Sequence, residues 1–368
     1  AIASAGPTAS TWYFAEGRVG GGFKQFLTIA NPGITACSVD INYLYRVDGS
    51  TSDSSKTVSV SVPAVSRFTE SVNADLHFSE LDMTTGANVA AIVSVNSGGT
   101  APLCEGIVVE RPMYFYFHSI QSGTDTLGTT REQLNDHYYF ADIPTGTSGE
   151  SFLSILNPQS TTANVTVKYY ANGNEVAHET LAVVALSRGT FQPNNLNMPD
   201  ADVAAVVSAD KKILVERPSY FKDRYHVNGA ASVTGATALG GDWFFAEGST
   251  GVGFQENLLI ANLSSTPQPV LISLQSATGG SAFTFAAINL PAKTQLIWNV
   301  NSNNDFTNHT DDVSAKVTSG GGGIVVQRQM FVTYHGQNGA NSSSTIQTSW
   351  NALGVTDTMG SPSTHNAY

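Results

Sequence analysis

The stretch Trp12-Tyr13-Phe14-Ala15-Glu16-Gly17 decides the fold, because the chain repeats it. Two further copies follow, Tyr138-Tyr139-Phe140-Ala141-Asp142 and Trp243-Phe244-Phe245-Ala246-Glu247-Gly248. Self-similarity of this kind along one chain marks an array of tandem repeats.

Two other landmarks recur in the same order. An apolar segment that reaches an Asn occupies 26–32, 152–158 and 257–262, and a closing segment with a central Arg occupies 107–115, 213–221 and 324–331. A Leu-Gly pair then follows at Leu127-Gly128, Leu239-Gly240 and Leu353-Gly354. We therefore predict three repeats at 12–128, 129–240 and 241–354, with an N-terminal arm at 1–11 and a C-terminal tail at 355–368.

Between the landmarks, apolar and polar residues alternate, as at Val39, Ile41 and Tyr43. This period of two, with β-branched and aromatic residues, indicates strands with one buried face. Asp48-Gly49 and Asn172-Gly173 then supply the positive φ angles of tight hairpins. About seven strands per repeat predict an all-β protein of three tandem immunoglobulin-like β-sandwich domains.

The composition limits the setting and the partners. Charged residues make up 12% of the chain and the net charge is −12, so phosphate backbones are repelled and nucleic acid is not expected as a partner. No apolar run is long enough for a membrane span, so membrane insertion is not expected. The chain begins Ala1-Ile2-Ala3 without Met, as after signal-peptide removal. We expect a secreted protein, at the cell surface or in an extracellular appendage.

The chain has two cysteines, Cys37 and Cys104, and both are peculiar to the first repeat. Cys37 aligns with Ala163 and Gln268, while Cys104 lies in a longer loop that the second repeat largely lacks. The economical interpretation is one disulfide that attaches this loop to the strand beginning near Cys37. A pair of free thiols is the alternative.

Each repeat carries an acid after its opening aromatic residues and an Arg in its closing segment. The pairs are Glu16 and Arg111, Asp142 and Arg217, and Glu247 and Arg328. A carboxylate could serve acid–base chemistry, but threefold recurrence favours a partly buried ion pair that fixes the first strand against the last. No metal, nucleophile or phosphate-binding motif accompanies them. We therefore expect no enzyme, no metal and no cofactor.

Four Asn-x-Ser/Thr sequons would accept N-linked glycans on an exported protein. They lie at Asn164, Asn262, Asn308 and Asn341. A chain so rich in Asn and Thr forms several such sequons by chance.

The aromatic opening, the Asn-Pro and the closing Val-Glu-Arg-Pro-Met-Tyr-Phe together resemble an uncharacterised repeat family of exported bacterial surface proteins, of the type in Actinobacteria and Chloroflexota. The resemblance covers nearly the whole chain and is strongest in the first repeat. Asp142-Ile143 and Arg328-Gln329 depart from its pattern. It implies an extracellular setting and supplies no active site.

We expect the chain to be a structural subunit that assembles with itself head-to-tail through its terminal segments. The tail that follows Leu353-Gly354 and ends at Tyr368 would meet the next subunit around Trp12, Tyr13 and Phe14, and the arm with Ala1, Ile2 and Ala3 would add to a neighbouring sheet edge. Such a contact does not close on itself and builds a filament or a surface layer.

Two other classes of protein remain as alternatives. An adhesin or a carbohydrate-binding surface stalk would use exposed aromatic rings to stack on surface glycans. A hydrolase would need a carboxylate pair in one deep cleft that the other repeats lack.

Overall fold

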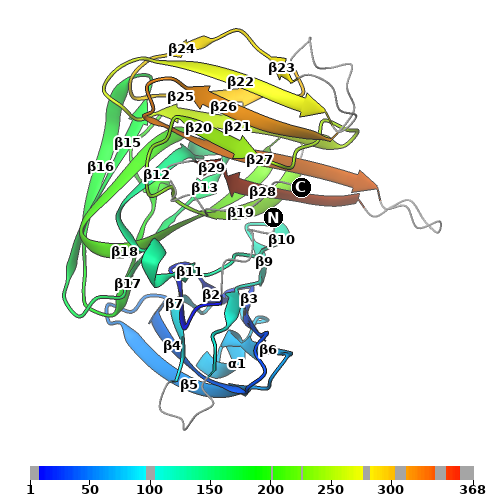
Figure 1. The fold of residues 1–368 in the computed structure, drawn as a ribbon. Helices are drawn as coiled ribbons and strands as arrows, with labels where there is room; N and C mark the ends of the chain where they lie inside the picture. The colour runs from blue at the N-terminus through cyan, green and yellow to red at the C-terminus, as the bar shows by residue number, and fades with distance from the viewer. Residues whose placement is uncertain are drawn as a thin grey trace.

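The computed structural model describes residues 8–96, 104–199, 202–224, 227–276, 282–302, 312–335 and 345–356. Within these residues nearly all of the regular structure is antiparallel β, with one α-helix, α1 (Val72–Leu76), and three single 3-10 turns at Arg131–Gln133, Gly146–Ser148 and Pro193–Asn195. The prediction of an all-β protein built from sandwiches is confirmed. The repeats follow one another around an arc, with the first repeat in blue and the last in yellow to red (Figure 1).

Each repeat forms two facing layers of strands, one of which holds the opening strand; in the first repeat the layers are joined into one sheet where Gly20 pairs with Phe23. In the first repeat the opening layer contains β1 (Thr11–Phe14), β2 (Arg18–Gly20), β4 (Cys37–Val47), β5 (Ser54–Val62), β7 (Gly86–Val95) and β11 (Thr129–Thr130). The facing layer contains β3 (Phe23–Asn31), β6 (Ser66–Ser71), β8 (Val108–Glu110), β9 (Met113–Phe117) and β10 (Ile120–Thr124).

The second repeat follows the same plan, except that one long strand, β18 (Val203–Arg224), serves both sheets. The opening sheet adds β12 (Asn135–Ile143), β15 (Ala163–Ala171) and β16 (Asn174–Val183). The facing sheet adds β13 (Glu150–Ser151), β14 (Leu153–Asn157), β17 (Ser187–Phe191) and β19 (Val227–Thr234).

The third repeat again has two sheets, whose closing strands form a long hairpin. The opening sheet contains β20 (Asp242–Phe245), β22 (Gln268–Ser276), β23 (Phe283–Thr284), β24 (Ile288–Leu290), β26 (Val313–Ser319) and β29 (Val355–Thr356). The facing sheet contains β21 (Phe254–Asn262), β25 (Thr294–Asn299), β27 (Ile324–His335) and β28 (Thr345–Leu353).

The strand order departs from that of an immunoglobulin at the two ends of each repeat. The second and fifth main strands pair in one sheet (β3 with β6), and the third and sixth pair in the other (β4 with β7), as in an immunoglobulin. The first strand, however, pairs with the sixth, and the closing strand pairs with the second. The opening acid and the closing Arg therefore belong to different sheets, and a bond between them ties the sandwich together.

A buried Asn closes the same corner of every sandwich. Its side-chain amide donates to three carbonyls across the corner, and its carbonyl oxygen accepts from the amide two residues further on. Asn31 reaches Thr35, Val62 and Pro63 at 2.8–3.1 Å, and Asn157 and Asn262 make the equivalent bonds. Because a buried amide must be hydrogen-bonded, this position demands Asn, which explains the recurring Asn landmark.

A glycine lies under the aromatic rings of each opening strand. A Cβ on Gly128 would stand 2.7 Å from the Phe14 ring, and one on Gly354 would stand 2.7 Å from the Phe245 ring. In the second repeat this position is held by Gly235, below Phe140. The Leu239-Gly240 pair is therefore not the equivalent of the other two Leu-Gly pairs: Gly240 already bridges to Ile324 within the third repeat.

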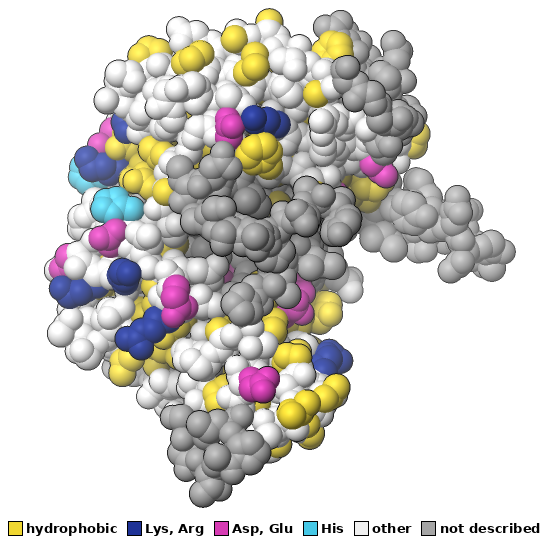
Figure 2. All heavy atoms as spheres, in the orientation of Figure 1, with side chains coloured by type: hydrophobic (Ala, Val, Ile, Leu, Met, Phe, Trp, Pro, Cys, Tyr) yellow, Lys and Arg dark blue, Asp and Glu magenta, His cyan; other side chains and the backbone are white. Residues whose placement is uncertain are grey.

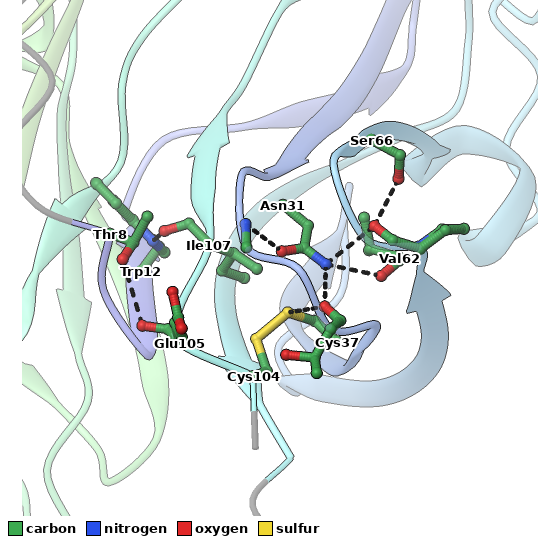
Figure 3. The surroundings of a disulfide bond; sticks show 12 residues. Thr8, Trp12, Asn31, Cys37, Val62, Ser66, Cys104, Glu105 and Ile107 are labelled. Carbon is green, nitrogen blue, oxygen red and sulfur yellow. Dashed lines mark hydrogen bonds between the residues drawn. A yellow bond between two sulfur atoms is a disulfide. The ribbon is translucent and has the colours of Figure 1, made fainter. Parts of the chain in front are cut away.

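The structure joins Cys37 to Cys104 in a disulfide, and no free cysteine remains (Figure 3). The bond lies beside the Asn31 corner, and Trp12 is anchored close by through a 2.8 Å bond from its indole nitrogen to the Ile107 carbonyl. It closes a loop of sequence separation 67 that contains most of the first sandwich.

Replacing both cysteines by Ala should destabilise the first sandwich by about 4 kcal/mol, because the unfolded chain regains the freedom of that loop. Urea unfolding followed by the fluorescence of the four tryptophans, of which Trp12 lies in the first sandwich, measures the loss. Reducing agent should lower the midpoint of the wild type equally and leave the double variant unchanged. Equal midpoints for oxidised and reduced wild type would contradict the prediction.

Candidate functional site

The three acid–arginine pairs that the sequence singles out all come together. Arg111 Nη2 lies 2.6 Å from Glu16 Oε2, and Arg328 Nη2 lies 2.7 Å from Glu247 Oε2. In the second repeat Arg217 Nη1 is 3.7 Å from Asp142 Oδ2 and donates to the Asp142 carbonyl. The three guanidinium groups are buried, and the candidate sites of the first two repeats are charged clusters inside the protein, whereas Glu247 of the third is exposed.

The contact between the first and second repeats is called the first junction, and that between the second and third repeats the second junction. At the first junction the second repeat contributes another carboxylate to the cluster. Glu216 Oε2 lies 2.8 Å from Arg111 Nη1 and accepts hydrogen bonds from the amides of Ala15 and Glu16 at 3.0 and 2.6 Å. Ser232, also from the second repeat, donates to Glu16 Oε2 at 2.5 Å. Sequence reasoning missed Glu216, because nothing local shows that the residue before Arg217 reaches the Arg of the preceding repeat.

Burial and counter-charge set the ionisation of this cluster. Burial raises the pKa of Glu16, with Arg111 opposing it. Burial also acts to lower the pKa of Arg111, but Glu216 and Glu16 outweigh it and the net shift is upward. Arg111 thus stays cationic between two carboxylates, and its Nη1 and Nη2 donors are used in structural bonds.

The second junction brings the same positions together with amides in place of charges, but its contacts differ, because the buried Gln327 side chain makes no hydrogen bond within the described residues and Gln295 makes the bonds instead. Gln327 stands where Glu216 stands, since each lies opposite the same position of the neighbouring strand, Leu259 and Ser154. Gln295 likewise stands where Arg188 stands. Its amide donates to the Ala141 carbonyl at 2.7 Å and to Asp142 Oδ1 at 2.9 Å.

Each junction therefore consists of an incoming pair from the later repeat and a receiving pair from the earlier one. Arg188 and Glu216 are the incoming pair at the first junction, and Glu16 and Arg111 receive them. Gln295 and Gln327 come in at the second, and Asp142 and Arg217 receive them. In both cases the formal charges of the four residues sum to zero, which a buried cluster requires.

Apolar side chains surround both charged clusters. Tyr13, Ala15 and Leu44 of the first repeat share one buried cluster with Leu156 and Leu214 of the second. At the second junction Ala141, Tyr170 and Ala204 belong to the core of the third repeat. The closing hairpins also pack in sequence, β10 against β19 and β19 against β28.

The described assembly residues of the sequence analysis lie against their own chain. Trp12 and Phe14 are in the first core, and Tyr13 packs on the second repeat. Leu353 is half-buried, and Gly354 is buried below Phe245 and Trp243. The opening strand therefore offers little surface to another subunit. Ala1, Ile2, Ala3 and Tyr368 lie outside the described residues.

The sequons fall in different surroundings. Asn262 is the buried corner residue of the third repeat, and its amide nitrogen already makes three hydrogen bonds, so the folded chain has no room for a glycan there. Asn164 is exposed and bonds to Asp210. Asn308 and Asn341 lie outside the described residues.

A cavity of about 570 Å³ lies at the first junction. Its walls combine the rings of Phe23, Phe117 and Tyr220 with the polar side chains of Glu150 and Arg188. Its size is that of a small-ligand pocket. Arg188 is 7% exposed, and no carboxylate lies within ion-pair distance of it in the described part of the chain.

Glu256 is a buried acid of the third repeat at the position of Gln25 and Ser151. The backbone amide of each of these three residues donates to the side-chain oxygen of an Asn, which is Asn301 in the case of Glu256. Burial raises the pKa of Glu256 from 4.5 to about 8, and Arg328 opposes this only in part.

Within the described ranges, no group of three or more His, Cys, Asp or Glu side chains could hold a metal ion. None of the helices described is long and apolar enough to cross a membrane. On the face in Figure 2 the charged side chains are scattered over the surface and gather in no single patch.

No family model and no curated protein matches this chain. Among solved structures, a Thermotoga maritima protein aligns with 28% of this chain and 95% of its own at 14% identity, with a TM-score of 0.25. The Anabaena sensory rhodopsin transducer aligns with 22% of this chain and 78% of its own at 28% identity, with a TM-score of 0.20. A tandem repeat from the extending region of a large adhesion protein covers 87% of this chain and 68% of its own at 10% identity, with a TM-score of 0.15. These scores are too low to bear on function.

Replacing Glu216 by Ala should lower the free energy of unfolding by about 3–5 kcal/mol, because Arg111 loses a buried counter-charge and two amides lose their acceptor. Urea unfolding measures the change. Glu132, an exposed acid outside the junctions, is the control, and Glu132→Ala should stay within about 0.5 kcal/mol of the wild type. Similar losses for the two variants would contradict a buried role for Glu216.

The raised pKa of Glu256 predicts a pH-dependent stability. The folded chain holds this proton more tightly than the unfolded chain, so the stabilisation by neutral Glu256 is complete below pH 4.5 and is lost as pH rises towards about 8. Glu256→Gln should flatten the slope and raise stability at pH 8 by about 2–4 kcal/mol.

Urea midpoints at pH 5 and 8 test this dependence. Gln25→Glu is the reciprocal control and should introduce the same slope into the first repeat. A wild-type midpoint that does not fall between the two pH values would contradict the raised pKa.

Proposed function

We propose that this chain is a non-enzymatic structural protein of the bacterial cell exterior, a subunit that joins copies of itself head-to-tail into a filament or surface layer. One observation carries the proposal: both junctions place the same two positions of the later repeat against the acid and the Arg of the earlier repeat, with Glu216 making the bond at the first junction and Gln295 at the second. Repeats that stack by one rule form a quasi-one-dimensional body, and such a body can be extended by further copies.

Other features support an extracellular structural role. A disulfide persists in oxidising compartments. The recurring acids and arginines, which are the groups best suited to acid–base chemistry, are engaged in ion pairs in all three repeats. Membership in the exported surface-repeat family that the motifs resemble is part of the same proposal.

A second candidate function is the binding of surface glycans by an adhesin or stalk. It rests on the first-junction cavity, where Phe117 stacks on His118 with ring centres 3.9 Å apart beside polar side chains. Flat rings next to hydrogen-bonding groups suit the apolar and polar faces of a sugar.

Electron microscopy of the native protein without denaturant tests the first function. We expect regular polymers about one sandwich wide, together with a particle mass that rises with protein concentration. Monodisperse three-repeat particles at every concentration would contradict assembly. A glycan array probed with wild type and Phe117→Ala would then test the second candidate.

A further inference from the structure

Two faces of the outer repeats are left uncovered by the described residues. The first repeat has the residues of an incoming pair, Arg67 and Glu110, and no other described repeat receives them. The strand registers place them there: Arg67 lies opposite Ala30 as Arg188 lies opposite Leu156, and Glu110 lies opposite Thr28. Both side chains are exposed.

The third repeat has a receiving pair that no other repeat covers within the described part of the chain. Glu247 and Arg328 form the ion pair, but the Glu247 side chain is 61% exposed, whereas Glu16 is 4% exposed and Asp142 is fully buried. Ala246 is exposed as well, while its equivalents Ala15 and Ala141 are fully buried. No carboxylate of the described residues reaches the amides of Ala246 and Glu247 as Glu216 reaches those of Ala15 and Glu16.

The two uncovered pairs have the same residue types as the two pairs that meet at the first junction. There a charged incoming pair meets a Glu–Arg receiving pair, and at the second junction a neutral incoming pair meets an Asp–Arg pair. The ends of the chain leave a charged incoming pair, Arg67 and Glu110, and a Glu–Arg receiving pair, Glu247 and Arg328. Four such residues again sum to zero charge, so they can be buried together.

The side chains around the free pairs also fit in size. The incoming face of the first repeat offers Ala30 and Val108, the same residue types as Ala261 and Val325 of the third repeat. The latter two share a cluster with the large Tyr170 of the second repeat. The free receiving face has the large Gln275 at the position of Tyr170, and beside Glu247 it opens into a hollow of about 550 Å³.

We propose that the first repeat of one copy docks on the third repeat of another, with Glu110 bound between Arg328 and the amides of Ala246 and Glu247. This interface rests on the proposed head-to-tail function and names the surfaces that perform it. Lys316 and Ser314 replace the Val206 and Ala204 of the second repeat, so less apolar surface is buried than at the internal junctions. Assembly is therefore reversible and depends on concentration.

Two blocked variants of the full chain test this interface. Glu110→Lys removes the incoming carboxylate and leaves the receiving face intact, and Ala246→Trp fills the receiving face and leaves Glu110 intact. Both positions are exposed, so folding should be preserved, and circular dichroism checks this. Glu175→Lys, an exposed acid on the second repeat, is the control with the same change of charge.

Analytical ultracentrifugation over a concentration series should show polymers for the wild type and the control. Each blocked variant alone should need at least about tenfold higher concentration to associate. Their mixture should form one-to-one dimers and nothing larger, since only one usable contact remains.

The outcomes separate this interface from the proposed function. Polymers of both blocked variants at wild-type concentrations, or a mixture that forms no dimers while the wild type polymerises, would overturn the interface and leave head-to-tail assembly standing. A wild type that stays monomeric throughout would overturn both.

Discussion

The architecture depends on a buried guanidinium that needs counter-charges from two directions. The side chain of Arg111 is fully buried, and an unpaired cation inside a protein is costly. Glu16 supplies one carboxylate from the opposite sheet of the same sandwich, and Glu216 supplies the other from the next repeat. One side chain thus couples the closure of a sandwich to the docking of its neighbour, so the two repeats are stabilised together.

The buried Asn corners make this possible, because they hold the backbone to which the charged groups are attached. Asn31, Asn157 and Asn262 close one corner of each sandwich with near-identical bonds. Asn73, Asn194 and Asn301 bind the strand that follows the opening acid. With both ends of that strand held, the acid and the Arg meet at the same place in every repeat while the residues around them vary.

Much of this structure follows from the sequence alone, since repetition and alternation reveal strands, sandwiches and the residues that meet within a repeat. The Cys37–Cys104 bond and the three acid–arginine pairs are of this kind. The junctions are not, because Glu110, Glu216 and Gln327 occupy one position and only the stacking of sandwiches decides which Arg each approaches. Short motifs also mislead at two positions. At Asn262 a sequon coincides with the buried corner residue, and at Gly240 a Leu-Gly pair resembles the pairs whose glycine lies below the aromatic rings.

The difference between the two internal junctions has a consequence for how such a chain finds its native order. Repeats of similar sequence risk docking on the wrong neighbour during folding. If the third repeat settled on the first, Gln295 and Gln327 would leave Arg111 with a single carboxylate, and the amides of Ala15 and Glu16 would lose the charged acceptor that Glu216 supplies. The incoming residues are Arg and Glu at one junction and Gln at the other. This difference favours docking of each sandwich on its native neighbour.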